Sequence, residues 1–544
     1  MDVVSDALVT DLYEVTMALS YMREDMTGLA TFSLFARRLP ANRGFLVAAG
    51  LESCLDYLAG LHVDDGDIEA LVDLLGLDRR DIEPLRGLRF TGDVWAIPEG
   101  RIVLAGEPLV EVCAPLPEAQ LVETFLLNQV THQTSVASKA VRCVLAAAGK
   151  PVVDFFSLRR THGVEAGMQA ARLSALAGFT ATSNVAAAAT YHLTATGTMA
   201  HSYIEAFDSE ETAFRAFAAS TPGPVTLLVD TYHTLEGVRT AARVLKTIRR
   251  PDMAIRLDSG ELGSLAASAR RILDAAGLRD VRIIAGGGLD EYVIDHLVRV
   301  GAPIDVFAVG TKMGLSADAP YLDTAYKLVD YDGRPVMKLS AGKATTPGAK
   351  QVFRRPRFND RLGTRDEPPP PDGEPLLVPV MKNGHRIGPA DLLDNARHRL
   401  QADLAALPYT ARRIRHPHPP LACRSKPLFE ADDAPQLDKW LDTCWSSGAG
   451  HVAISGIGGD AVEAPAQVGQ GLFDGGRHRR HCGWVLDRPL LGASLAGQRG
   501  PITWRQHGPR ADGIVLIADV DVHGPLRCAA HAEPPAFRVR EPIM

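Results

Sequence analysis

The feature that most constrains the fold is a series of short apolar runs between residues 151 and 311, each ending in polar, glycine-rich or acidic residues. Helical stretches separate the runs, whose ends recur every 18 to 29 residues, the length of one strand plus one helix. These ends lie at Asp154, Ser183, His201, Asp230, Asp258, Gly286 and Gly310. Continuous apolar strands of this kind are typical of a parallel sheet buried on both faces.

Seven such units in tandem favour a TIM-like α/β barrel over a doubly wound open sheet. The alternation alone fits both folds, and closure of the sheet stays open at this point. In both folds the functional groups lie at the carboxyl ends of the strands. Here those ends carry Arg, His, Asp, Ser, Thr and Gly, whereas the strand bodies are apolar.

The flanking segments define the expected domains. Residues 1–117 predict an N-terminal α/β domain, with a strand at 30–34, and residues 118–330 predict the barrel domain. Residues 331–427 are expected to return to the N-terminal domain and complete a second α/β domain. Residues 428–544, which contain four of the five Trp, form a C-terminal extension of unknown function.

Two long helices are predicted in these segments. One covers residues 118–150, where breakers are few and a glycine stands at the end. The other covers 391–406 and follows the proline-rich run at 367–375, which is typical of a stiff exposed loop.

Bulk composition excludes several classes of function. The formal net charge of −7 gives no basic excess for nucleic acid. Seven scattered Cys without a CxxC pair indicate a reducing compartment. The acidic N-terminus lacks the features of a signal peptide, and no run of about 18 apolar residues predicts a membrane span. We therefore expect a cytoplasmic protein without nucleic-acid or membrane partners.

The strand ends carry groups suited to a small anionic ligand that contains a sugar. Arg159 and Arg160 follow one strand, and a guanidinium fork matches carboxylate or phosphate. Arg256 and Asp258 lie two residues apart and so point to the same side of a strand. Gly310 lets backbone amides approach an anion. Further basic residues are Arg37, Arg38, Lys338, Lys343 and Lys350.

Each of these features also has an ordinary structural explanation. An Arg pair is usually a solvated face, a strand-ending Asp is often a helix cap, and a lone His is more often structural than catalytic. Recurrence at nearly every strand end of one contiguous block favours the functional interpretation.

Nine motifs in this order resemble the nicotinate phosphoribosyltransferase family, over residues 5 to about 427. They are TDLYEVTMA (10–18), FARRLPANRGFLVAAGLE (35–52), DFFSLRRTHG (154–163), TSN (182–184), GTMAHS (197–202), LLVDTY (227–232), IRLDSG (255–260), GTKMGLSADAP (310–320) and YKLVDYDGRPVMKLSAGKATTPGAKQVFR (326–354). Ordered motifs are far more specific than a single glycine-rich loop.

The resemblance implies an ATP-coupled ligase-type enzyme of NAD salvage with a type II phosphoribosyltransferase fold. Nicotinate and phosphoribosyl pyrophosphate would give nicotinate mononucleotide and pyrophosphate, with Mg²⁺ as cofactor and ATP as co-substrate. It also implies a head-to-tail homodimer with active sites at the subunit interface.

The resemblance assigns the pyridine site to a few residues. Tyr13 of the neighbouring subunit and Phe156 would stack on the two faces of the ring, with Arg159 beside its charged groups. Ser183, with Thr182 in the same motif, would bind the substrate. Related nicotinamide enzymes have an Asp at the position of Ser183, which would repel a carboxylate, whereas a neutral Ser can donate to it.

The resemblance also assigns residues to the phosphoribosyl site. Arg256 and Asp258 would hold phosphoribosyl pyrophosphate and act in catalysis. His201 would be the catalytic phosphohistidine that ATP phosphorylates. The remaining substrate contacts would come from Gly287, from Gly310 and Thr311 at the 5′-phosphate, and from Arg37 or Arg38 of the partner at the pyrophosphate.

Two departures from the family pattern keep alternatives open. Gly288 stands where the family usually has an Asp that contacts ribose, and His233 replaces another usual Asp. The alternatives are a nicotinamide- or quinolinate-using homologue and a catalytically weakened nucleotide-binding regulator. In the extension, residues 453–464 could form a strand, glycine-rich turn and helix, and a zinc site at His478, His481 and Cys482 is not favoured.

Overall fold

The computed structural model describes residues 5–428 except positions 249, 339, 341, 342, 344 and 426, and further along the chain the backbone of five strands. The chain divides into two compact units, Met1–Pro435 and Gln436–Met544, which are described separately.

A parallel sheet lies at the centre of the block predicted from the strand–helix spacing. Five strands pair in the order β6-β10-β9-β8-β7, and every neighbouring pair is parallel. The strands are β6 (Val152–Asp154), β7 (Thr226–Leu228), β8 (Ala254–Leu257), β9 (Arg282–Ala285) and β10 (Val306–Val309). Their side chains are almost all buried, as the continuous apolar runs predicted.

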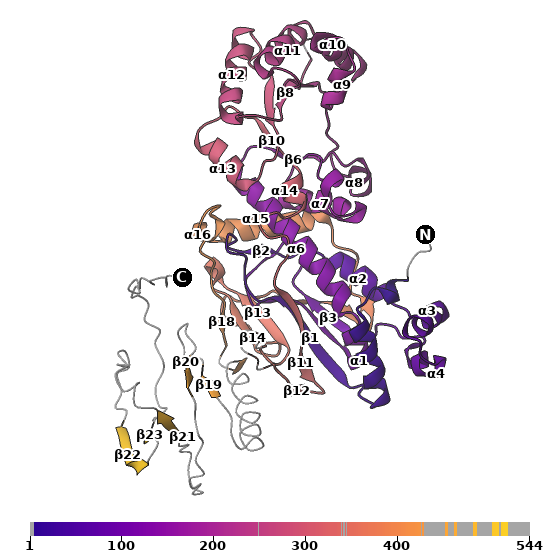
Figure 1. The fold of residues 1–544 in the computed structure, drawn as a ribbon, viewed down its shortest axis with the longest axis vertical. Coiled ribbons are helices and arrows are strands. Elements are labelled where there is room, and N and C mark those ends of the chain that lie inside the picture. Colours follow the sequence, from indigo (N-terminus) through magenta and orange to yellow (C-terminus); the bar gives the residue numbers. More distant parts are fainter. Residues whose placement is uncertain are drawn as a thin grey trace, which may run out of the picture. The chain divides into compact units, whose positions relative to one another are not determined.

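Helices connect and cover these strands (Figure 1). They are α7 (Val164–Ala177), α8 (Val185–Thr190), α9 (His201–Glu205), α10 (Glu210–Ser220), α11 (Thr234–Ile248), α12 (Leu262–Ala275), α13 (Glu291–Arg299) and α14 (Thr311–Gly314). Apolar residues of all these helices except α8 form one hydrophobic core with the sheet.

Of the seven predicted strands, the one that ends near Ser183 is reduced to single pairings, and the one predicted at 197–202 forms no strand. Thr182 forms isolated parallel bridges with Asp154 and with Ala195. Beyond them, the Thr198 hydroxyl donates to the Thr226 carbonyl of β7 at 2.6 Å. These segments are rich in Ala, Thr, Ser and Gly and lack the β-branched apolar runs that extend a strand. The α/β fold with a parallel sheet is therefore confirmed, and closure into a barrel stays a prediction.

A seven-stranded sheet combines residues from both sides of the parallel block. Its order is β12-β11-β1-β5-β3-β16-β17, and its pairs are antiparallel. The strands are β1 (Leu29–Ala36), β3 (Asp93–Ala96), β5 (Pro108–Pro115), β11 (Thr324–Tyr331), β12 (Arg334–Pro335), β16 (Val378–Lys382) and β17 (His385–Arg386). The strand predicted at 30–34 is the middle of β1.

Smaller elements complete this part of the chain. The helices are α1 (Leu12–Arg23), α2 (Leu51–Gly60), α3 (Asp65–Leu75), α4 (Arg79–Ile82), α15 (Leu393–Ala406) and α16 (Tyr409–Arg412). The remaining strands are β2 (Leu46–Val47), β4 (Ile102–Val103), β13 (Lys350–Arg354), β14 (Arg361–Thr364), β15 (Glu374–Pro375) and β18 (Cys423–Arg424). Helix α15 confirms the helix predicted at 391–406.

One long helix separates the two cores. The region predicted as a single helix forms α5 (Leu116–Leu121) and α6 (Glu123–Ala146), with Val122 between them. Leu126 and Val130 of α6 belong to the core of the seven-stranded sheet, whereas Val136 and Ala140 belong to the core of the parallel sheet. Figure 1 shows α6 running between the two sheets.

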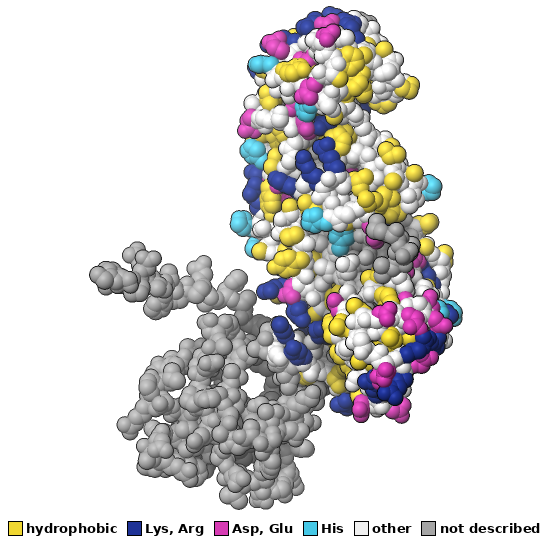
Figure 2. Space-filling view, turned by 45° about the vertical axis from the view of Figure 1, so that its right-hand side comes forward, with side chains coloured by type: hydrophobic (Ala, Val, Ile, Leu, Met, Phe, Trp, Pro, Cys, Tyr) yellow, Lys and Arg dark blue, Asp and Glu magenta, His cyan; other side chains and the backbone are white. Residues whose placement is uncertain are grey.

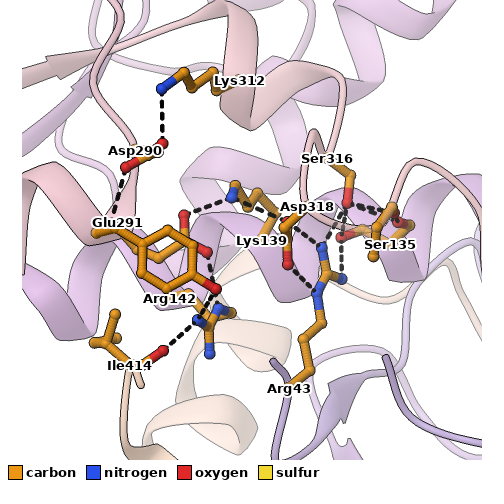
Figure 3. Close-up of polar contacts among 12 residues, drawn as sticks. Arg43, Ser135, Lys139, Arg142, Asp290, Glu291, Lys312, Ser316, Asp318 and Ile414 are labelled. Carbon is orange, nitrogen blue, oxygen red and sulfur yellow. Dashed lines mark hydrogen bonds and ion pairs between the residues drawn. The ribbon is translucent and has the colours of Figure 1, made fainter. Parts of the chain in front are cut away.

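Buried charges join α6 to its surroundings (Figure 3). We call Arg43, Lys139, Arg142, Glu291 and Asp318 the α6 charge network. Lys139 lies 2.5 Å from Glu291 and 2.9 Å from Asp318, and Arg142 lies 3.0 Å from Glu291. Arg43 lies 2.9 Å from Asp318. These ion pairs join the segment before β2, α6, α13 and the loop after α14.

In the second unit the described strands are β19 (Val452–Ile454), β20 (Val462–Ala464), β21 (Cys482–Leu486), β22 (Thr503–Arg510) and β23 (Gly513–Asp519). β19 and β20 pair antiparallel. The helix expected at the end of residues 453–464 is thus replaced by a strand, because Val462–Ala464 pairs with Val452–Ile454. His478 and His481, of the zinc interpretation, lie outside the described residues.

No helix within the described ranges combines the length and apolarity needed to cross a bilayer. Figure 2 shows basic and acidic side chains interspersed over one face, without a single basic field. This agrees with the mildly acidic balance of the sequence.

Candidate functional site

The turn after β6 is held in an uncommon conformation. Phe156 has φ of 65°, which a bulky residue adopts rarely and at a cost in strain. The amide of Phe155 donates to the Val309 carbonyl of β10 at 2.8 Å. A Cβ on Gly310 would come within 2.1 Å of the Phe155 carbonyl, so only glycine fits there. The turn is therefore locked against the end of β10.

Ser183 lies directly beside this turn. Its Oγ accepts a hydrogen bond from the Phe156 amide at 2.8 Å, and its own amide donates to the Asp154 carbonyl at 2.8 Å. No described residue accepts the Ser183 hydroxyl proton, which leaves this proton for a ligand.

Thr182 lies behind Ser183 and away from the protein surface. It is 1% exposed, and its hydroxyl donates to Asp154 Oδ2 at 2.7 Å. Burial raises the pKa of the Asp154 carboxyl, and hydrogen bonds, including that from Thr182, oppose the rise. This geometry gives Thr182 an internal partner where the sequence predicted a substrate contact.

Two guanidinium groups flank the Phe156 ring. The Arg159 guanidinium carbon lies 4.5 Å from the ring centroid, and that of Arg256 lies 5.1 Å away. Arg256 is 3% exposed and pairs with Asp258 at 2.8 Å. Its Nε is buried and has no hydrogen-bond partner among the described residues. An aromatic ring beside two guanidinium groups suits a flat anion.

The ends of β8 and β9 meet at Asp258. The Asp258 amide donates to Asp230 Oδ2 at 3.0 Å, while Asp230 Oδ1 is buried without a partner among the described residues. Gly287 has φ of 79°, and a Cβ there would come within 1.7 Å of the Asp258 carbonyl. Close backbone contact therefore requires glycine at this position.

Thr311 and His201 complete the strand-end groups. Thr311 is the first residue of α14, and its Oγ1 accepts from Arg160 at 3.2 Å. His201 is the first residue of α9, and its Nδ1 lies 3.1 Å from the Thr231 hydroxyl, next to Asp230 in the chain. A connected set of contacts thus brings together the strand-end residues predicted from sequence. They are Phe156, Arg159, Thr182, Ser183, His201, Arg256, Asp258, Gly287, Gly310 and Thr311.

Three predicted site residues make no described contact with this cluster. Tyr13 is 47% exposed and lines a groove of about 510 Å³ with Phe32 and Tyr326. Burial, Glu123 and Glu14 raise the pKa of its hydroxyl. Arg37 and Arg38 both pair with Asp323, at 3.0 and 2.9 Å.

The other basic residues singled out from the sequence make no described contact with this cluster. Lys350 is 3% exposed, and its ammonium group donates to the Thr346 and Gly348 carbonyls. Lys338 and Lys343 are exposed.

The carboxylate that the family usually has at the position of Gly288 is not replaced by the nearby Asp290. Asp290 Oδ1 caps α13 by accepting from the Tyr292 and Val293 amides, and Oδ2 pairs with Lys312 at 2.7 Å (Figure 3). Its pKa is lowered, because the bonds from Lys312 and the helix amides outweigh burial. Asp290 is therefore committed to structure and does not replace the missing carboxylate.

Sequence reasoning used Asp154 and Asp230 only as markers of strand ends and gave them no role. The structure shows that both accept hydrogen bonds from the site. Each is the polar residue that ends an apolar run, and this position was the signal that could have identified them. No cluster of three or more His, Cys, Asp or Glu side chains suited to a metal occurs among the described residues.

The fold and these residues define an α/β protein with an aromatic side chain and guanidinium groups at the carboxyl ends of parallel strands. Residues 8–131 match the family model of the nicotinate phosphoribosyltransferase (NAPRTase) N-terminal domain. The chain is 49% identical over 409 residues to nicotinate phosphoribosyltransferase pncB2 of Mycobacterium tuberculosis, covering 74% of this chain and 88% of that protein.

Two further relatives agree. Identity to nicotinate phosphoribosyltransferase of Bacillus subtilis is 44% over 358 residues, covering 64% of this chain and 73% of that protein. The crystal structure of human nicotinic acid phosphoribosyltransferase superposes with a TM-score of 0.69 and 28% identity, covering 78% of this chain and all of that one. The chain belongs to the nicotinate phosphoribosyltransferase family.

Proposed function

We propose that this chain transfers the phosphoribosyl group of phosphoribosyl pyrophosphate to nicotinate, forming nicotinate mononucleotide and pyrophosphate in NAD salvage. One observation carries the choice of substrate: the Ser183 hydroxyl, whose proton no described residue accepts, lies next to Phe156, whose ring Arg159 flanks at 4.5 Å. A flat ring with a carboxylate would stack on Phe156 and accept from Ser183.

The phosphoribosyl donor would bind along the strand ends. The unpaired Arg256 Nε and the Asp258 carboxylate would hold its ribose and pyrophosphate, with the 5′-phosphate at Gly310 and Thr311. The pyridine nitrogen attacks the anomeric carbon as the bond to pyrophosphate breaks, with inversion and with the electron pair leaving on pyrophosphate. The nitrogen is already nucleophilic, so catalysis is mainly positioning and charge stabilisation.

The donor set fits a magnesium ion that arrives with the pyrophosphate. Asp230 and Asp258 end neighbouring strands, and Asp230 Oδ1 is buried without a described partner. Mg²⁺ is commonly held by one or two carboxylates, substrate phosphates and water, so a larger cluster is not required. When bound, the ion would stabilise the charge on the leaving pyrophosphate.

His201 would couple the reaction to ATP. Because Nδ1 faces the Thr231 hydroxyl, Nε2 is left to attack the γ-phosphorus of ATP and release ADP. We also infer a homodimer, in which Tyr13 and Arg37 or Arg38 of one subunit reach the cleft of the other. We further infer that the Thr182 and Ala195 segments close the parallel sheet into a barrel between β6 and β7.

Turnover assays test the proposal. The purified chain is given phosphoribosyl pyrophosphate, Mg²⁺ and either nicotinate or nicotinamide, with and without ATP, and nucleotide formation is followed by chromatography. We expect turnover of nicotinate that ATP stimulates. His201→Ala should abolish the stimulation, whereas His296→Ala, an exposed histidine on α13, should not. Preference for nicotinamide or quinolinate would contradict the proposal.

Gly288 favours one alternative, a catalytically weakened homologue that binds nucleotide as a regulator. With Asp290 committed to Lys312 and α13, the ribose loses a carboxylate partner. Absence of turnover with every pyridine, combined with calorimetric binding of phosphoribosyl pyrophosphate, would support this alternative.

A further inference from the structure

Thr182 occupies the centre of a buried hydrogen-bond cluster directly behind Ser183. Its hydroxyl donates to Asp154 Oδ2 at 2.7 Å and accepts from the Asn184 amide at 3.1 Å. Thr182, Asp154 and Asn184 are 1%, 0% and 2% exposed. The hydroxyl therefore bridges Asp154 and Asn184 and cannot reach a ligand.

Ser183 itself is held at two further points. Its amide donates to the Asp154 carbonyl, and its Oγ accepts from the Phe156 amide, both at 2.8 Å. The left-handed conformation of Phe156 places that amide here. Because the Phe156 N–H occupies one lone pair of Oγ, the hydroxyl proton is directed elsewhere, and no described residue accepts it.

We propose that Thr182 is a positioning residue, anchored on Asp154, that holds Ser183 so that its hydroxyl donates to the carboxylate of the pyridine substrate. This inference rests on the proposed function and deepens it. A hydroxyl fixed as a donor bonds a carboxylate more strongly than a neutral amide. The preference for nicotinate over nicotinamide would then depend on Thr182, which contacts neither substrate.

The test compares Thr182→Val, which removes the hydroxyl with little change of shape, with Thr182→Ser, which keeps it. Thr180→Val is the matched control, because that hydroxyl faces the Val152 carbonyl at 3.3 Å, outside the cluster. Calorimetry on the full chain gives affinities for nicotinate and nicotinamide, and turnover gives KM for each substrate.

We expect Thr182→Val to lower the nicotinate-over-nicotinamide affinity ratio about 10-fold. The KM for phosphoribosyl pyrophosphate should stay within about twofold, because β8, β9 and β10 hold that substrate. Thr182→Ser and Thr180→Val should keep the ratio of the unmodified protein. A general loss of structure would instead weaken both substrates together.

An unchanged ratio in a folded Thr182→Val protein would overturn the inference, as would equal binding of acid and amide by the unmodified chain. Failure of the proposed function gives a different result. The chain would then bind nicotinate in preference to the amide and lose that preference in Thr182→Val, yet form no nucleotide. In that case the positioning role stands and the catalytic proposal falls.

Discussion

The α6 charge network and the strand-end residues contain the same kinds of charged side chain, but these side chains are paired differently. In the network, Lys139, Arg142 and Glu291 are buried and ion-paired with one another (Figure 3). Among the strand-end residues, Arg256 Nε and Asp230 Oδ1 are buried without described partners. Pairing lowers the cost of burying charge, whereas an unpaired buried atom carries that cost until a ligand meets it. The comparison separates charges that hold the fold from charges that we propose bind a ligand.

The largest expected effect comes from breaking the network. Glu291→Gln removes the charge shared by Lys139 and Arg142 and should lower the free energy of unfolding by about 3 to 5 kcal/mol. Urea unfolding of the full chain measures it. Glu236→Gln, in the exposed pair with Arg239, should change stability by less than about 0.5 kcal/mol. Equal losses of stability in Glu291→Gln and Glu236→Gln would show that the buried network stabilises the fold no more than an exposed ion pair does.

Arg256→Lys should lower activity strongly and change stability only slightly, the reverse of Glu291→Gln. We expect kcat/KM to fall by about 10² to 10³-fold, because a guanidinium aimed at developing charge is lost. Stability should change little, since a cation still faces Asp258. Steady-state kinetics and urea unfolding of one preparation give both quantities. A loss of stability as large as that of Glu291→Gln would show that Arg256 belongs with the structural charges.

A measurement of stability against pH extends the comparison to a second pair of buried charged groups, Glu107 and Asp360. Burial and the neighbouring Asp360 raise the pKa of Glu107 from near 4.5 to about 8. The folded state therefore holds this proton more tightly than the unfolded chain. Its stabilising contribution is fully present below about pH 4.5 and is lost as the pH rises through about 8.

We accordingly expect the free energy of unfolding to fall by roughly 1 to 3 kcal/mol between pH 6 and 9. Glu107→Gln mimics the protonated acid, can still accept from the Leu104 amide, and should flatten this dependence. The exposed Glu83→Gln serves as control. Parallel profiles for the unmodified protein and Glu107→Gln would count against a proton held by this group.

The smallest expected effect concerns Gly288. Gly288→Asp restores a carboxylate where a Cβ meets nothing within 4 Å, although φ is 75°. We expect a two- to tenfold rise in kcat/KM, with a stability loss of about 1 kcal/mol from the left-handed backbone. Gly277→Asp has a similar φ of 77° and open space, after α12, and should lose stability without gaining activity.

Local patterns predicted most of the parallel sheet, because strand and helix each have a characteristic period. They failed at Thr182, where single bridges replace a strand, and at 197–202, where no strand forms, because neighbouring segments decide the pairing. The strand-end residues could be named because parallel strands bring their carboxyl ends together. The internal role of Thr182 could not, since nothing in TSN reveals that its hydroxyl meets Asp154.

The α6 charge network was beyond sequence reasoning for a related reason. Arg43 and Asp318 lie 275 positions apart, and no periodicity connects them. Tyr13, Arg37 and Arg38 illustrate another limit. Their predicted place in the cleft depends on a second subunit, which a single chain cannot supply.

The order of the seven-stranded sheet has a consequence for biosynthesis. Its middle strands β1, β5 and β3 are synthesised early, and the strands that pair with them on either side, β11 and β16, follow the whole parallel block. Until residue 382 has left the ribosome, the nascent chain carries open hydrogen-bonding edges, which are prone to association with other chains. We expect truncation before β11 to yield insoluble protein, and soluble, monodisperse material from such a truncation would refute this.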